Sequence, residues 1–118
     1  MKITEKSINS IQVISISGRV DSISANDLEE YLNSAIKNNS QMVFDLSDTE
    51  YISSSGLRVF LAALKTMKTR DAEMKLASLQ PVIRNILDIS GLSNIFSIYH
   101  NLNDAMDSFG KKDCSIKH

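Results

Sequence analysis

Two hydrophobic spacings succeed each other along this chain. Residues 11–17, Ile-Gln-Val-Ile-Ser-Ile-Ser, are apolar or β-branched on both alternations, which predicts a strand covered on both faces and ending at Gly18. Residues 1–6 predict a shorter edge strand, and the polar residues 7–10 predict the turn that folds it back as a hairpin. The chain is therefore expected to begin with two paired strands.

The hydrophobic period changes after this hairpin. Apolar residues recur every three or four positions, which predicts an amphipathic helix. Its buried stripe consists of Leu28, Tyr31, Leu32, Ala35 and Ile36. Ser24 is the expected N-cap, Asp27 places an acid in the first turn, and Asn38-Asn39 ends the helix.

The two patterns then alternate to the end of the chain. Strands are predicted at Met42, Phe44 and Leu46, at residues 73–78 and at residues 95–99. Three apolar stripes predict three further helices. They consist of Leu57, Phe60, Leu61, Leu64 and Met67, of Val82, Ile86 and Leu87, and of Leu102, Ala105, Met106 and Phe109.

Glycine, proline and asparagine indicate where the last two helices begin and end. Pro81 suits the first turn of one helix, and Gly91 follows that helix. Asn101 or Asn103 is the expected cap of the other helix, and Gly110 is expected to end it.

The predicted order of elements is β-β-α-β-α-β-α-β-α, which indicates an α/β domain with a mixed, mostly parallel central sheet and about four helices. We expect one domain over residues 1–110 and a frayed polar tail over residues 111–118. Loops at the carboxyl ends of parallel strands form the working surface of such folds. Residues 18–24 and 47–56 are therefore expected to lie near each other there.

Composition excludes several classes of function. The chain has 118 residues, 42% of them hydrophobic, which suits one core, and 13 Lys and Arg against 14 Asp and Glu give a net charge of −1. Such a balance predicts no nucleic-acid partner and no membrane partner. One cysteine, no signal peptide and no run of about 18 apolar residues favour a reduced, cytoplasmic setting.

Signatures of common enzymes are missing from the sequence. There is no phosphate-binding glycine loop, no GxGxxG and no HExxH, and the chain has too few soft ligands for a closed zinc site. His100 lies at a predicted strand end, His118 is the last residue, and Cys114 lies in the polar tail, so none is placed as a base or nucleophile. We expect no enzymatic activity, no metal and no cofactor.

A run of three serines stands at the start of the second predicted helix. Ser53, Ser54 and Ser55 come directly before Gly56 and Leu57, the first apolar residue of that helix. Unpaired N–H groups and the positive end of the helix dipole meet at such a position. One reading makes one serine an N-cap and the others loop residues. The other reading makes one serine an exposed phosphoacceptor and hence a charge switch.

At residues 45–58, Asp-Leu-Ser-Asp-Thr-Glu-Tyr-Ile-Ser-Ser-Ser-Gly-Leu-Arg, the sequence resembles the signature of bacterial anti-sigma factor antagonists, the STAS domain family. Residues 18–21, Gly-Arg-Val-Asp, and 87–92, Leu-Asp-Ile-Ser-Gly-Leu, are similar to two further family segments, so the resemblance covers residues 1–110. It implies a small α/β domain that binds an anti-sigma factor with GHKL-type Ser/Thr kinase activity, which frees the sigma factor. A PP2C-type phosphatase is a further implied partner.

The resemblance also implies roles for single residues. Ser54 matches the phosphoacceptor, with Ser55 as the fallback, and phosphorylation would abolish binding. The implied partner surface comprises Asp21, Ser22, Ser53, Ser54, Ser55, Gly56, Leu57 and Arg58. A loop aspartate that caps a turn explains Asp21 equally well. Two positions depart from the family pattern, because Ser53 stands where Asp is usual and Arg58 where a small residue is frequent.

Three other functions stay open at this point. Related domains act as scaffolds in stress-signalling assemblies, and the same loops could sense a small ligand. A small α/β enzyme that uses a loop serine is the third, and a His or Lys within hydrogen-bond reach of Ser54 would support it.

Overall fold

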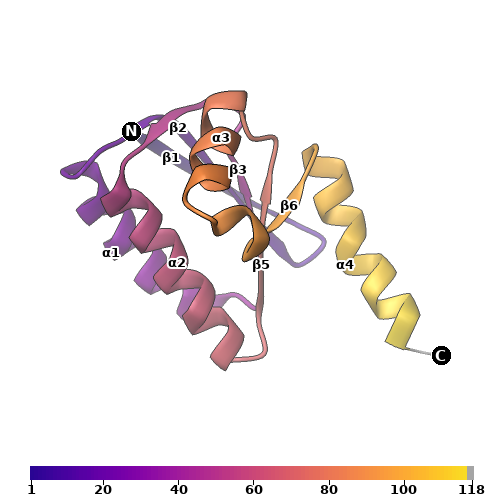
Figure 1. Ribbon diagram of the computed structural model, residues 1–118. Coiled ribbons are helices and arrows are strands. Elements are labelled where there is room, and N and C mark those ends of the chain that lie inside the picture. Colours follow the sequence, from indigo (N-terminus) through magenta and orange to yellow (C-terminus); the bar gives the residue numbers. More distant parts are fainter. Residues whose placement is uncertain (117–118) are drawn as a thin grey trace.

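A six-stranded sheet with helices on both faces forms the described part of the protein (Figure 1). The computed structural model describes residues 1–116, with side chains up to residue 109. The strands are β1 (Lys2–Ile8), β2 (Ile11–Val20), β3 (Gln41–Asp45), β4 (Thr49–Ile52), β5 (Glu73–Ala77) and β6 (Ser97–Tyr99). The helices are α1 (Ser24–Asn38), α2 (Ser54–Thr69), α3 (Pro81–Ile89), the 3₁₀ helix η1 (Leu92–Asn94) and α4 (Leu102–Ile116).

The sheet is mixed and mostly parallel, as predicted. Its strands lie in the order β1-β2-β3-β5-β6, with β4 paired to the end of β2. Only the β1–β2 pair is antiparallel within the described residues. The helices α1, α2 and α3 cover one face and α4 covers the other (Figure 1). The α/β class and the four α-helices are therefore confirmed.

The predicted hairpin is confirmed, and its first strand is longer than expected. Ile8 pairs with Ile11, so the connection is two residues long. Asn9 and Ser10 both have left-handed backbones, with φ of 52° and 68°. Two positive φ values in a two-residue loop match the twist of the flanking strands, so the turn holds the register without glycine.

Two sequence predictions about strands need correction, the end of β2 and the order of elements, which lacked β4. Gly18 does not end β2, because its φ of 90° lets the strand shift register between Gly18 and Arg19 and continue to Val20. Beyond that point β2 leaves β3 and pairs with β4, which the sequence did not reveal. The four residues of β4 are too few for an alternating hydrophobic pattern to be recognised in the sequence. The Thr49 hydroxyl of this strand is buried and donates to the Ile16 carbonyl at 2.6 Å.

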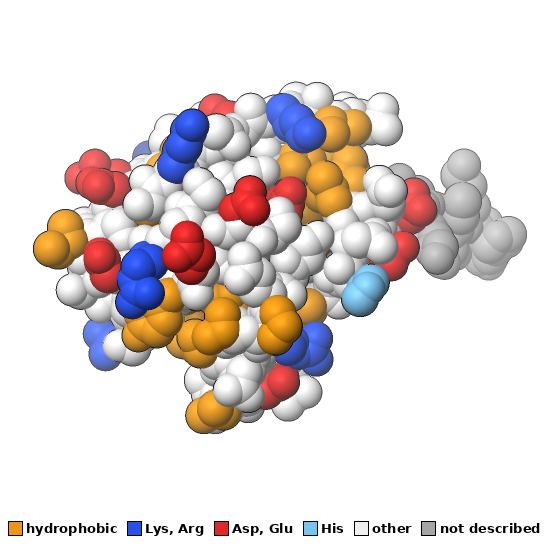
Figure 2. Space-filling model, turned by 90° about the horizontal axis from the view of Figure 1, so that it is seen from above, with side chains coloured by type: hydrophobic (Ala, Val, Ile, Leu, Met, Phe, Trp, Pro, Cys, Tyr) orange, Lys and Arg blue, Asp and Glu red, His pale blue; other side chains and the backbone are white. Residues whose placement is uncertain are grey.

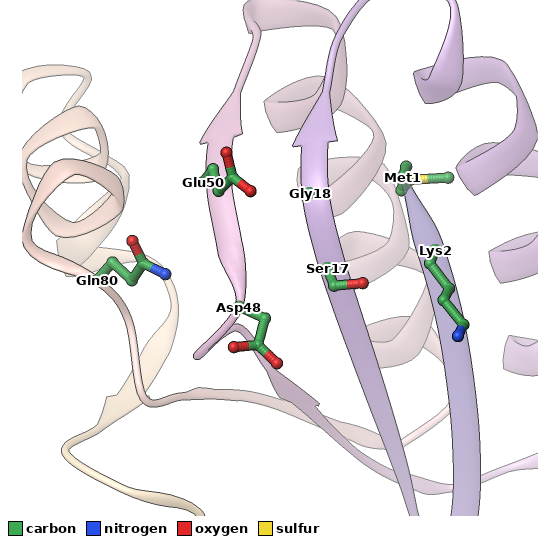
Figure 3. A pocket seen from close by; sticks show the side chains of 7 residues that line it. All are labelled: Met1, Lys2, Ser17, Gly18, Asp48, Glu50 and Gln80. Carbon is green, nitrogen blue, oxygen red and sulfur yellow. The ribbon is translucent and has the colours of Figure 1, made fainter.

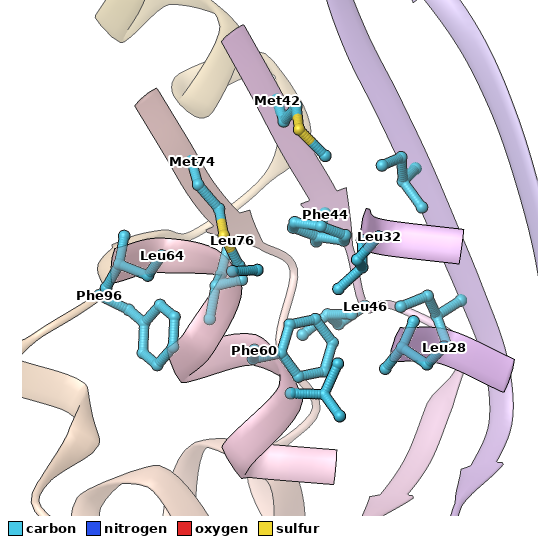
Figure 4. Close-up of a cluster of buried hydrophobic side chains, with 14 of the residues drawn as sticks. Leu28, Leu32, Met42, Phe44, Leu46, Phe60, Leu64, Met74, Leu76 and Phe96 are labelled. Atoms are coloured by element: carbon cyan, nitrogen blue, oxygen red, sulfur yellow. The ribbon is translucent and has the colours of Figure 1, made fainter. Parts of the chain in front are cut away.

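The larger part of the core lies between the sheet and α1, α2 and α3 (Figure 4). At its centre, the rings of Phe44 and Phe60 meet edge to face with centroids 5.3 Å apart. The stripe predicted for α3 needs one correction, because Val82 is 46% exposed and Ile83 is buried instead. Ile83 and Leu87 lie four residues apart, so they share the side of α3 that faces the sheet.

The last strand and helix differ from their predicted bounds. β6 contains only Ser97–Tyr99, and Ile95 is exposed. Asn101 caps α4 as expected, since its side-chain oxygen accepts from the Asp104 N–H at 2.8 Å. Gly110 does not end α4, because glycine within a helix costs only about 1 kcal/mol relative to alanine. Residues 117–118 of the predicted tail lie outside the described residues, and the boundary at residue 110 stays a prediction.

A lysine is buried beneath α4. Lys75 of β5 is 7% exposed, and its ammonium donates to the Ser108 hydroxyl at 2.6 Å. The same nitrogen lies 4.2 Å from the centroid of the Phe109 ring and 5.3 Å from that of Tyr99. Within the described residues, a hydroxyl and two aromatic faces thus replace water around this charge.

We expect Lys75→Met to fold with unchanged or higher stability, because an apolar chain of similar length removes a buried charge. Ser108→Ala should cost about 1–3 kcal/mol in the wild-type protein, because it removes a hydroxyl that Lys75 needs. Ser108→Ala should lower the free energy of unfolding by less in the Lys75→Met variant than in the wild-type protein. Urea unfolding of the four proteins gives this double-mutant cycle. Equal costs in both backgrounds would show that Lys75 does not depend on Ser108.

Candidate functional site

The serine run lies where β4 passes into α2. Ser53 has an extended backbone, and its hydroxyl accepts from the Gly56 N–H at 3.2 Å. Its carbonyl accepts from the Leu57 N–H at 2.9 Å, the first bond of the helical ladder. Ser53 is therefore the N-cap of α2. The strand before it is β4, whereas the sequence suggested the strand at 42–46.

The next two serines differ in their access to solvent. Ser54 is exposed at the first position of α2, while Ser55 is half-buried. The Ser54 hydroxyl makes no hydrogen bond within the described residues, to a histidine, a lysine or any other group. The first turn of α2 has no acidic residue, so no side-chain carboxylate there offsets the positive end of the helix dipole.

Backbone bonds join the two loops that were predicted to meet. The Ser53 N–H donates to the Val20 carbonyl at 2.7 Å, and the Gly18 N–H donates to the Asp48 carbonyl at 3.0 Å. The neighbourhood of residues 18–24 and 47–56 is thus confirmed. Beside them, the Arg19 guanidinium lies 4.7 Å from the centroid of the Tyr51 ring, a pairing across β2 and β4.

Gly56 permits this close approach. A Cβ at this position would lie 2.8 Å from a methyl of Val20 and 2.9 Å from a methyl of Ile52. Both distances are below van der Waals contact, so a side chain at Gly56 would force α2, Val20 or Ile52 to shift. The close packing of α2 against Val20 and Ile52 therefore explains why a glycine follows the three serines.

Asp21 caps α1, which corrects the prediction that Ser24 does so. Its carboxylate accepts from the N–H groups of Ile23 at 3.0 Å and Ser24 at 2.8 Å, and its carbonyl accepts from Ala25 at 2.9 Å. Ser24 completes a reciprocal pair, because its hydroxyl accepts from the Asp21 N–H at 2.9 Å. The Ser24 backbone and side-chain bonds hold the pKa of the Asp21 carboxyl below its usual 3.8.

The structure brings the remaining expected residues to the same end of the molecule. Ser22 is exposed between Asp21 and Ile23, Leu57 is half-buried, and Arg58 is exposed one turn along α2 from Ser54. Figure 2 shows acidic, basic and hydrophobic side chains side by side on the end that these loops form. The sequence had not singled out Ile23, although an apolar residue within a capping turn was a visible signal.

A polar pocket of about 550 Å³ opens beside this surface (Figure 3). Asp48 and Glu50 line one side of it, and Lys2 and Ser17 line the other. The Gln80 amide, which donates to the Ser47 carbonyl at 2.7 Å, closes the side toward α3. Asp48 and Glu50 thus face a shallow opening between the ends of β1, β2 and β4.

No group of three or more His, Cys, Asp or Glu among the described residues is arranged to hold a metal ion. Among the same residues, no helix has both the length and the apolar character needed to span a membrane.

The chain belongs to the STAS domain family, whose model matches residues 2–105. It is 34% identical over 110 residues to BtrV of Bordetella bronchiseptica, covering 92% of this chain and 95% of that protein. It is 34% identical over 90 residues to the anti-sigma-B factor antagonist of Bacillus subtilis, covering 76% and 82%. The crystal structure of an anti-sigma factor antagonist from Mycobacterium paratuberculosis has the same fold, with a TM-score of 0.84, 24% identity and coverage of 91% and 92%.

Gly56→Ala should destabilise the protein by about 1–3 kcal/mol, because the new methyl group overpacks Val20 and Ile52. Urea unfolding monitored by circular dichroism measures the change. Ser55→Ala, at the neighbouring position, is the matched control and should cost less. A cost for Gly56→Ala below about 0.5 kcal/mol would contradict the tight packing at this position.

Asp21→Ala should lower the urea midpoint at pH 7, because two N–H groups lose their acceptor. The pKa of Asp21 is lowered by folding, so its stabilisation is present above 3.8 and lost as the pH falls through the folded value. The difference in urea midpoint between wild type and Asp21→Ala should therefore be smaller at pH 2 than at pH 7. Ser22→Ala, in the same turn, should have the urea midpoint of wild type at both pH values. A gap of equal size at both pH values would rule out a contribution from the carboxylate charge.

Proposed function

We propose that this protein is an anti-sigma factor antagonist that acts in the cytoplasm. It binds an anti-sigma factor with GHKL-type Ser/Thr kinase activity and so releases the sigma factor held by that kinase. Membership of the STAS domain family supports this function, as does 34% identity to the Bacillus subtilis protein named anti-sigma-B factor antagonist. The protein itself is a binding module, and the phosphoryl-transfer chemistry belongs to the kinase.

The proposed binding surface combines the start of α2 with the turn before α1. It comprises Asp21, Ser22, Ser53, Ser54, Ser55, Gly56, Leu57 and Arg58. Backbone bonds from Ser53 to Val20 and from Gly18 to Asp48 hold its two halves together, so a partner meets one preformed surface. Preformed surfaces lose little conformational entropy on binding.

Ser54 is the proposed phosphoacceptor, and its exposure is the observation that carries the proposal. Its hydroxyl is accessible at the first position of α2 and has no hydrogen bond within the described residues. The two neighbouring serines are less accessible, because Ser53 is the N-cap and Ser55 is half-buried. A kinase can therefore reach Ser54 without unfolding the helix.

Phosphorylation would break the complex by adding charge within the interface. A phosphate adds about −1.5 to −2 charges at Ser54 and would have to lose water on binding. Asp48 and Glu50 are exposed on the same end of the molecule, so they add to the negative potential that the partner meets. Arg58 lies four residues further along α2 and offsets part of this charge. Removal of the phosphate by a PP2C-type phosphatase would restore binding.

Ser54→Asp should weaken binding to the anti-sigma factor at least about tenfold, because a carboxylate mimics part of the added charge. Ser54→Ala should bind as wild type but should not be released when ATP is added. Baits of wild type, Ser54→Asp and Ser54→Ala, with Ser55→Ala as the matched control, retain the partner from lysate of the source organism. Mass spectrometry identifies it, and titration with the purified kinase gives the affinities.

Three outcomes would alter the proposal. Equal binding by wild type and Ser54→Asp would remove the charge switch from Ser54 while leaving the binding function. Release of Ser54→Ala but not Ser55→Ala by ATP would move the switch to Ser55. Recovery of no anti-sigma factor by wild type would overturn the antagonist function itself.

A further inference from the structure

An isoleucine in the turn that caps α1 is exposed to solvent. Ile23 is 79% exposed and belongs to neither hydrophobic cluster of the protein. Single exposed apolar residues are common on monomeric proteins, so exposure alone marks no site. Ile23 differs from such residues because its backbone is fixed, because it lies next to the proposed binding surface and because acidic residues lie near it on α1.

The backbone of Ile23 is fixed on both sides. Its N–H donates to the Asp21 carboxylate at 3.0 Å, and its carbonyl accepts from the Asn26 N–H at 3.3 Å. Its φ of −79° and ψ of −51° are those of a helix. The side chain thus leaves the surface from a rigid base, and a contact made through it loses little entropy.

Ile23 also lies next to the proposed binding surface. The Ser53 N–H donates to the Val20 carbonyl at 2.7 Å, which brings these two backbones together. Ile23 follows Val20 by three residues, and Ser54 follows Ser53 by one. With 3.8 Å between consecutive Cα atoms, the Cα atoms of Ile23 and Ser54 lie within about 20 Å of each other. An ordinary interface of about 800 Å² per partner is roughly 30 Å across, so one partner can cover both.

Two acidic residues lie on the side of α1 that Ile23 shares. Asp27 and Glu30 follow Ile23 by four and seven residues, so they share its side of the helix, and both are exposed. The first Lys or Arg of α1 is Lys37, near the carboxyl end of the helix. A partner that receives Ile23 therefore meets negative charge on the α1 side of this residue.

We propose that Ile23 is an apolar anchor of the anti-sigma factor interface, and that it enters an apolar pocket of that partner bordered by Lys or Arg side chains. This inference rests on the proposed function, because the occupant is the same anti-sigma factor. The binding surface then extends from the start of α2 across the cap of α1, with Ile23 and Ser54 as separate contact points.

Ile23→Ala tests the anchor, and Ile89→Ala is its matched control. Ile89 is equally exposed, at 79%, but stands at the carboxyl end of α3, about 12 Å along that helix from its start. Both variants are titrated calorimetrically with the purified anti-sigma factor, beside urea unfolding of each. We expect Ile23→Ala to raise the Kd about tenfold or more and Ile89→Ala to change it less than about twofold. Neither should lower the urea midpoint.

Charge is tested separately with Glu30→Lys. This variant should slow association and reduce the dependence of the association rate on salt, because basic groups of the partner lose an attraction. Unchanged rates would overturn the basic border of the pocket.

The result for wild type separates the two proposals. If wild type binds the anti-sigma factor and Ile23→Ala binds equally well, or no worse than Ile89→Ala, the anchor is overturned while the antagonist function stands. If wild type does not bind, the proposed function fails and the anchor fails with it.

Discussion

The absence of a side chain at Gly56 is the constraint on which the surface at this end depends. Because no Cβ stands there, the first turn of α2 rests against the methyl groups of Val20 and Ile52, at the ends of β2 and β4. That contact sets where α2 begins and therefore which serine faces inward as the cap and which faces water. It also places Val20 close enough for its carbonyl to accept from Ser53, which ties the α1 turn to the α2 start.

Both helices that form the surface begin with a side-chain cap, but the two caps differ in charge. Asp21 brings a carboxylate to the start of α1, whereas Ser53 brings a neutral hydroxyl to the start of α2. The positive end of α2 is therefore not offset by a first-turn acid. A phosphate at Ser54 would meet a favourable dipole within its own helix and unfavourable carboxylates at Asp48 and Glu50. Under the proposed function, release of a partner would depend on the charge and desolvation of the interface rather than on disruption of the helix.

The two faces of the sheet have separate roles. The large cluster beneath α1, α2 and α3 fixes the helices that carry the surface, and its centre is the Phe44–Phe60 contact. The small cluster lies beneath α4, and the buried Lys75 lies beside it, with its ammonium against Ser108 and the Phe109 ring. The helices that carry the residues proposed to bind a partner thus lie on the face of the sheet opposite α4.

Local patterns in the sequence were enough for the class of fold, the helices, the hairpin and the serine run at a helix start, because periodicity and capping act over a few residues. They narrowed the cap of α4 to Asn101 or Asn103, and the structure shows that it is Asn101. The tertiary structure decided what depends on distant partners. β4 exists because β2 continues past Gly18 to pair with it, and Val82 is exposed because α3 turns Ile83 toward the sheet. The exposure of Ser54 was settled in the same way, by the packing of α2 against two strands.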